Sequence, residues 1–172
     1  MSDVTVRPAA VEDCEAMAGW LSQPDVNRWL GSEWRGAAVD ARRLAFALKD
    51  KQTRVFVVLA GSSPCGLVVI SNLDAGDGVG LLWYAMGDSR FGRQGVMTRA
   101  VARVLDVAFA ELGLNALQAW IHPDNIASLR VLEKAGFRAA GRLRDATVFG
   151  GVRADRLMFD VTLADWRSAR TT

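Results

Sequence analysis

The apolar residues near the start of the chain alternate with polar ones, which is typical of a strand covered on one face. This alternation spans residues 4–8 and stops at Pro8. Residues 54–60 and 65–70 are rich in β-branched and aromatic side chains, and the Gly-Ser-Ser-Pro segment between them predicts a hairpin. Residues 79–86 are apolar without alternation, so we expect a strand that is covered on both faces.

Other segments show the three- and four-residue spacing of apolar side chains that is typical of helices. The clearest covers residues 94–112 and is followed by Gly113, a residue type that commonly ends helices. The same criteria predict helices over residues 11–21, 26–30 (a short turn after a break at Pro24), 40–49 and 125–135.

Three further strands are predicted over residues 116–121, 146–149 and 156–161, and the last two are joined by a Gly-Gly turn. The predicted order is therefore β-α-α-β-β-β-α-β-α-β-β. Strand–helix–strand units in the second half favour a mixed sheet with helices on its faces, in the α/β (α+β) class. A length of 172 residues favours a single domain that spans residues 1–172.

Composition narrows the class of protein. Hydrophobic residues make up 51% of the chain and charged residues 23%, a balance that excludes a disordered chain. The formal net charge of +2 is too small to indicate nucleic acid as a partner. Cys14 and Cys65 predict free thiols in a reducing compartment, and together with the single His122 they offer no metal site. The start of the chain lacks signal-peptide features and its apolar runs are short, so we expect a cytoplasmic protein without a membrane span.

The turn before the 94–112 helix carries the most informative residues. It reads Arg-Phe-Gly-Arg-Gln-Gly-Val-Met-Thr over residues 90–98. Glycines let a backbone approach a ligand closely, and the free N–H groups of a helix's first turn attract anions. Arg90 and Arg93 add positive charge. The turn therefore favours the binding of a pyrophosphate group, and a purely structural glycine turn is the alternative.

Two common nucleotide-binding motifs do not fit this turn. A Walker loop needs Gly-Lys-Ser/Thr, which the segment lacks. A dinucleotide-binding fingerprint needs an acidic residue about twenty positions further on, whereas Asp106 falls inside the predicted helix.

The turn instead resembles the acetyl-CoA loop of the GNAT superfamily, usually written Gln/Arg-x-x-Gly-x-Gly/Ala. Gly95 matches the first glycine of that pattern, whereas Gly92 and Met97 depart from it at the flanking positions. A second segment, residues 125–137, is similar to the Asn-x-x-Ser-x-x-x-x-Glu-Lys-x-Gly-Phe segment of the RimJ/RimL-like branch. The two motifs occur in the expected order, with a strand between them.

The resemblance implies an enzyme that moves an acetyl group from acetyl-CoA directly to a primary amine. It also implies a mostly antiparallel sheet that splays open at the cofactor, with helices on both faces. The diphosphate is expected on the backbone amides of residues 92–96, and the pantetheine arm between the 79–86 and 116–121 strands. The residues expected to contact acetyl-CoA are Ala85, Met86, Arg90, Gly92, Arg93, Gln94, Gly95, Val96, Met97, Thr98, Asn125 and Ser128.

The catalytic groups are implied less directly. Asn125 is expected to hydrogen-bond the pantetheine, although asparagine also favours helix N-caps. Ser128 is expected to protonate the departing thiolate. The alternative interpretation is that Ser128 is only a small polar residue beside the cofactor. Many GNAT enzymes use a tyrosine as this acid, but Leu132 stands at that position and the single tyrosine is Tyr84. A thiol pKa of about 8.5 means that the leaving group needs little acid help.

No general base is evident from the sequence. Water, Glu33, Asp74, Asp155 and His122 are the candidates, and Thr147 stands where RimL-like relatives carry a carboxylate. A lone histidine at a strand end is more often structural.

The resemblance also implies that the loop near residue 30 covers the site of the acceptor, the amine that receives the acetyl group. This amine could belong to a protein N-terminus, a polyamine, an aminoglycoside or an amino sugar. A homodimer is also left open. A rival class is a catalytically idle acyl-CoA sensor or interaction module of the same fold. The residues expected to line the acceptor pocket are Trp29, Glu33, Trp34 and Tyr84.

Overall fold

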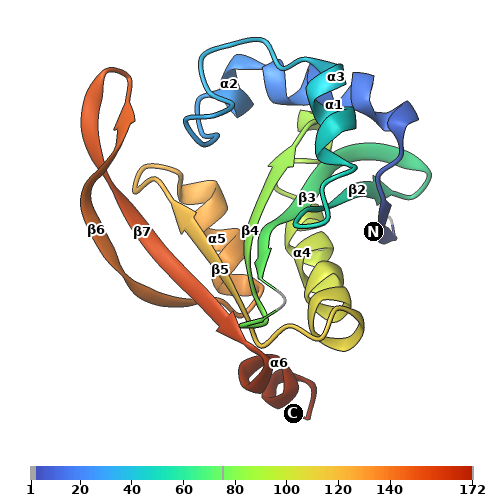
Figure 1. Cartoon of the computed structure of the whole chain (residues 1–172), viewed down its shortest axis with the longest axis vertical. Coiled ribbons are helices and arrows are strands. Elements are labelled where there is room, and N and C mark those ends of the chain that lie inside the picture. The colour runs from blue at the N-terminus through green and yellow to red at the C-terminus, as the bar shows by residue number, and fades with distance from the viewer. Residues whose placement is uncertain (1–2, 75, 172) are drawn as a thin grey trace.

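A single mixed sheet forms the centre of the computed structural model, which describes residues 3–74 and 76–171. Residues 1, 2, 75 and 172 of the predicted domain lie outside the described part. The strands are β1 (Val4–Pro8), β2 (Arg54–Ala60), β3 (Ser63–Asp74), β4 (Val79–Met86), β5 (Ala116–Ile121), β6 (Arg138–Phe149) and β7 (Val152–Thr162). Their spatial order is β1-β2-β3-β4-β5-β7-β6, and only β4 and β5 pair in parallel (Figure 1).

Helices cover both faces of this sheet, as expected. They are α1 (Cys14–Ser22), α2 (Pro24–Asn27), α3 (Ala41–Ala47), α4 (Val96–Asp106), α5 (Ile126–Lys134) and α6 (Leu163–Arg170). Successive side chains of a strand point to opposite faces. Val57 of β2 therefore joins a core cluster with Met17 of α1, whereas Val58 joins a second cluster with Val101 of α4. In β4, Leu82 and Ala85 fall into these two different clusters, which confirms that this strand is covered on both faces.

The helix predicted over residues 94–112 is divided in the structure. It begins at Val96 because Gly95 has a φ of +69°, a left-handed conformation that cannot continue a helix. After Asp106 the chain forms a π-helical turn, Val107–Glu111. The apolar spacing was read correctly, since the buried side chains of α4 face the sheet.

Three other predictions were wrong in detail. The predicted break lies at the extended residue Gln23, after which Pro24 starts α2, because proline suits the first position of a helix. The helix predicted over residues 11–21 begins as a 3₁₀ turn, Val11–Asp13, before α1. The strand predicted over residues 146–149 is only the end of a longer strand, β6, which begins at Arg138 and whose mostly exposed residues give no alternating pattern.

Helix α6 was not predicted, because it has no buried residue and a weak apolar face. A local signal was nevertheless present, since Thr162 and Asp165 form a capping box at its start. Trp166 ties the helix to the body by donating to the Asp106 carboxylate at 2.9 Å. No helix in the described part of the chain is both long and apolar enough to cross a membrane.

Candidate active site

The parallel strands β4 and β5 separate along their length. They pair only at Val79–Leu81 with Ala116–Gln118. Beyond Leu81 the strands diverge (Figure 1), and within the described ladders the second half of β4 is paired on its β3 side alone. Backbone groups along this edge need partners other than a strand, so the gap suits a ligand that carries amide groups.

A cavity of about 1030 Å³ occupies this gap. Leu82 and Tyr84 pack with the cluster beneath α4 and α5, whereas Trp83 packs with the cluster beneath α1 and α3. All three side chains line the cavity. Since they come from opposite faces, the cavity passes through the sheet where β4 and β5 part. Two ligands can therefore approach one another from the two faces.

The N-terminus of α4 forms one wall of the cavity. Both Arg93 and Gly95 have positive φ, at 59° and 69°, so the chain turns sharply before the helix begins. Gly95 caps the helix without a side-chain bond, which leaves the first-turn amides available to an anion. The predicted turn residues that line the cavity are Gly92, Arg93, Gly95, Val96, Met97 and Thr98, and Ala85 and Met86 line it from β4.

Two residues predicted for the cofactor site do not line the cavity. The Arg90 guanidinium binds the Asp88 carboxylate at 2.6 Å, and this bond lowers the pKa of Asp88. Gln94 donates from Nε2 to the Arg90 carbonyl at 2.7 Å. Arg90 is thus engaged within its own turn, whereas Arg130 and Lys134 of α5, which the sequence reasoning missed, do line the cavity.

Helix α5 brings Asn125 and Ser128 to the cavity. The Asn125 Oδ1 accepts from the Ser128 amide at 3.2 Å, so asparagine does serve as the N-cap. Its Nδ2 group is a separate donor, so capping and ligand binding are compatible. The motif therefore places an amide donor and a hydroxyl on the same turn beside the gap.

Tyr84 connects the two walls. Its hydroxyl donates to the Ser128 carbonyl at 2.9 Å, and burial raises its pKa. A neutral phenol that already donates to a carbonyl links β4 to α5 and stabilises their relative position. Leu132, at the position of the usual catalytic tyrosine, is buried and lines the cavity.

The loop between α2 and α3 closes the cavity on the α1–α3 side. Trp29, Glu33 and Trp34 all line it, as expected for the acceptor pocket. The Trp29 ring stacks on Phe149 of β6 with centroids 5.0 Å apart. Arg35 donates to the Val148 carbonyl and to Thr147. These contacts join the end of β6, beside the tip of the β6–β7 hairpin, to this loop.

Asn27 holds the loop in place, and sequence reasoning missed it because nothing local marks it. This side chain is buried, with 8% exposure. Its Nδ2 group donates to carbonyls of Leu21, Trp34 and Ala37, and its Oδ1 accepts from the Gly36 amide at 2.7 Å. One amide therefore fixes both ends of the segment that presents the tryptophans.

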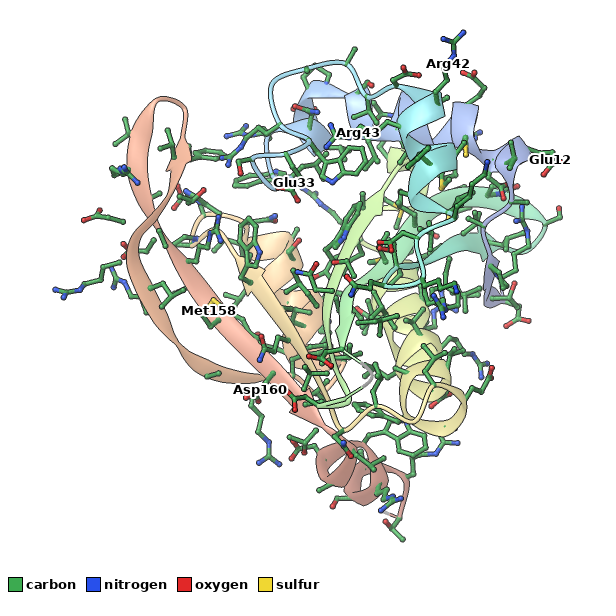
Figure 2. The ribbon with its side chains drawn as sticks, viewed as in Figure 1. Glu12, Glu33, Arg42, Arg43, Met158 and Asp160 are labelled. Atoms are coloured by element: carbon green, nitrogen blue, oxygen red, sulfur yellow. The ribbon has the colours of Figure 1, made fainter. Side chains whose placement is uncertain are left out.

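The structure separates the candidate general bases. Glu33 lines the cavity, and Figure 2 shows it beneath the α2–α3 loop, on the side that faces the β6–β7 hairpin. Asp74 instead accepts from the Gly76 amide, and Asp155 binds Arg142. His122 also lines the cavity, and its Nδ1 accepts from the Asp124 amide at 3.2 Å.

Comparisons with known proteins bear on this site. The family model described as an acetyltransferase (GNAT) domain matches residues 3–138. An uncharacterized N-acetyltransferase, p20 of Bacillus licheniformis, is 24% identical over 164 residues, with 92% of each chain covered. The structure of spermidine N-acetyltransferase from Vibrio cholerae with CoA and spermine is similar at a TM-score of 0.85, with 17% identity, covering 95% of this chain and 98% of that one. The ribosomal-protein-S5-alanine acetyltransferase from Vibrio fischeri gives 0.81, with 22% identity and 96% of each chain.

Proposed function

The chain belongs to the GNAT acetyltransferase family and is an acetyl-CoA-dependent N-acetyltransferase, and on that premise we propose that it transfers the acetyl group directly to an amine that enters from the opposite face of the sheet. The observation that carries this proposal is the single cavity that crosses the sheet between β4 and β5. A through-going cavity lets two substrates meet without a covalent enzyme intermediate. Holding the amine and the thioester close together in a reactive orientation supplies much of the rate enhancement.

The thioester occupies the α4–α5 side in this proposal. First-turn amides of α4, beside Gly95, bind the diphosphate, and Arg93 adds charge. The unpaired edge of β4 at Ala85 and Met86 takes the pantetheine amides, helped by Asn125. This arrangement directs the thioester carbon toward the opening between the strands.

The amine occupies the side covered by α1, α3 and the α2–α3 loop. Its nitrogen lone pair attacks the thioester carbon, the carbon–sulfur bond breaks and the amine loses a proton. Glu33 is the carboxylate that we assign to attract the ammonium group and receive that proton, directly or through water. Ser128, which lines the cavity, is the group that we assign to protonate the thiolate, and the Tyr84 hydroxyl supports it by donating to the Ser128 carbonyl.

The acceptor comes from one of the classes that the similar structures suggest. One similar enzyme acts on spermidine and another on the alanine of a ribosomal protein. A protein N-terminal amine and a small-molecule amine both satisfy the chemistry of the cavity, and we propose a primary amine of one of these kinds.

The test combines binding and turnover. Calorimetry should show acetyl-CoA binding to the purified chain, and an amine panel should then release free CoA thiol. Ser128→Ala should lower kcat by less than about tenfold, because a thiolate is a good leaving group. Binding without thiol release from any amine would show a protein that only senses acetyl-CoA, and absence of binding would overturn the assignment of the α4 turn.

A further inference from the structure

A row of apolar side chains crosses three strands on the acceptor side of the cavity. Val55 of β2 pairs with Val69 of β3, which in turn pairs with Trp83 of β4. These side chains lie on the face covered by α1 and α3, because they pack with the core cluster beneath those helices. All three line the cavity. The row therefore leads from the gap between β4 and β5 toward β2.

Further apolar side chains surround this row. Leu81 lies two residues before Trp83 and so points to the same face of β4. Across from the strands, Trp34 of the α2–α3 loop packs with Trp83 at a ring-centroid distance of 6.4 Å. We name this part of the cavity the apolar channel, and the lining residues that define it are Trp34, Leu44, Ala47, Val55, Val69, Leu81 and Trp83.

The apolar channel retains apolar surface that the fold itself does not cover. Small-molecule sites are typically lined by such side chains, with a few polar groups that fix the orientation of the ligand. Removal of this surface from water would stabilise a bound apolar group. The residues of the channel that are only half-buried are Trp34, Ala47, Val55, Leu81 and Trp83.

The charges beside the channel are negative. Among the described residues that line the cavity on this side, the charged ones are Asp25 of α2 and Glu33 of the α2–α3 loop. The other polar residues that line this side are uncharged: Thr53, Ser71 and Asn72. One ammonium group therefore finds a carboxylate near the loop. A second ammonium group, placed along the channel, would lose its hydration against apolar side chains without a counter-charge, which is costly.

We propose that the acceptor is a primary monoamine with an apolar chain or ring beside the amine, and that the apolar channel binds this apolar part. The inference rests on the proposed function, because it assigns the substrate class of the same cavity. The amine lies at the opening between β4 and β5, where Glu33 attracts it, and the apolar part extends over Trp83 toward Val55 beneath α3. The apolar part can belong to a small amine or to the first residue of a peptide.

The experiment uses the full-length protein, acetyl-CoA and the straight-chain amines from propylamine to hexylamine, which all carry one charge. Each added methylene that enters the channel should raise kcat/KM about fourfold, which corresponds to about 0.8 kcal/mol. The matched diamine is cadaverine, which has the length of hexylamine but ends in a second ammonium group. Hexylamine should have a kcat/KM at least about tenfold higher than cadaverine, because the second charge is not compensated in the channel.

Two peptides of equal length distinguish the sources of the apolar part. One begins with leucine and the other with lysine, and the leucine peptide should have the higher kcat/KM for the same reason as hexylamine. A leucine peptide that exceeds hexylamine would identify a peptide N-terminus as the source. A hexylamine that exceeds the leucine peptide would identify a small amine, and either result supports the inference.

Variants identify the groups responsible. Val55→Thr introduces a hydroxyl into the channel and should reduce the hexylamine-to-cadaverine ratio by about threefold or more, with acetyl-CoA affinity unchanged. Val6→Thr is the matched control, since Val6 is half-buried on β1, packs with the cluster beneath α4 and does not line the cavity. Ala47→Leu fills the channel from α3 and should lower kcat/KM more for hexylamine than for propylamine. This size effect keeps the test decisive if Val55→Thr is poorly folded.

Several outcomes would overturn this inference. Turnover of cadaverine as fast as that of hexylamine, or a kcat/KM that does not rise with chain length, would contradict it while leaving acetyl transfer intact. Equal ratios in Val55→Thr and Val6→Thr would also contradict it. Faster turnover of hexanoyl-CoA than of acetyl-CoA would show that the channel holds an acyl chain instead. Failure of acetyl-CoA itself to bind, measured in the same preparation, would remove the proposed function on which the inference rests.

Discussion

Replacing Asn27 by alanine tests whether one buried amide organises the acceptor loop. The substitution removes two N–H donors, shared among three backbone carbonyls, and one acceptor that serves the Gly36 amide. A net hydrogen bond contributes about 1 kcal/mol, and an unsatisfied buried group costs about 1–3 kcal/mol. Part of this cost is relieved because the bonds to the Trp34 and Ala37 carbonyls are only partly buried. We therefore expect a loss of roughly 2–4 kcal/mol in the free energy of unfolding.

Two measurements check this value. Urea denaturation should give the loss directly, and the thermal midpoint should fall by roughly 4–16 °C for a domain of this size. Steady-state kinetics should show a higher acceptor KM, because the loop presents Trp29, Glu33 and Trp34. Acetyl-CoA affinity should stay unchanged, since its proposed contacts lie on α4, β4 and α5.

Asn115→Ala is the matched control for Asn27→Ala. Asn115 is exposed, and its side chain makes one long bond of 3.4 Å to the Asp77 carbonyl. Its replacement should cost less than about 0.5 kcal/mol. Equal stabilities of the Asn27 and Asn115 variants would refute the reasoning, as would an unchanged acceptor KM in a clearly destabilised Asn27 variant.

Three other perturbations test separate parts of the site. Gly95→Ala should weaken acetyl-CoA binding in calorimetry, because a φ of +69° costs alanine about 1–2 kcal/mol of conformational energy. Gly113→Ala is its control. Gly113 has a φ of +67° but does not line the cavity, so this variant should be destabilised similarly without a change in binding. Trp34→Ala should raise the acceptor KM about tenfold with little change for acetyl-CoA, and an unaltered acceptor KM would argue against its place in the pocket. Tyr84 is the single tyrosine, so phenolate absorbance reports it alone, and its midpoint should lie above the ordinary value of 10.0. Because the pKa of Tyr84 is raised in the folded chain, its contribution to the free energy of unfolding should be complete below pH 10.0 and should decrease as the pH rises further. The Tyr84→Phe variant should lack this decrease.

Local signals in the sequence were enough to predict the turn before α4 and the start of α5. The positive φ of Gly95 and the N-cap at Asn125 depend on neighbours within one helical turn, so a short motif specifies them. The apolar spacing of α4 likewise revealed its buried face. Arg90 does not line the cavity and pairs with Asp88 in its own turn, and the spacing of glycines and arginines along the chain did not indicate this pair.

Elements with little burial were harder to predict. The exposed β6 has no alternation to read, and its pairing with β7 shifts register twice. Helix α6 buries no residue, so only its capping box marked it. Periodicity reports the contrast between a buried and an exposed face, and these segments offer little such contrast.

The sequence by itself determined the helices and strands with strong apolar patterns, the glycine turn before α4 and the family to which the chain belongs. Only the tertiary structure decided what surrounds the α2–α3 loop and the cavity beneath it. Trp29 meets Phe149, and Trp120 meets Arg156, because the strand order β5-β7-β6 carries the last hairpin beside β5 and back to the α2–α3 loop. Contacts between segments more than thirty residues apart depend on how the whole sheet is assembled, and no local pattern along the chain encodes them.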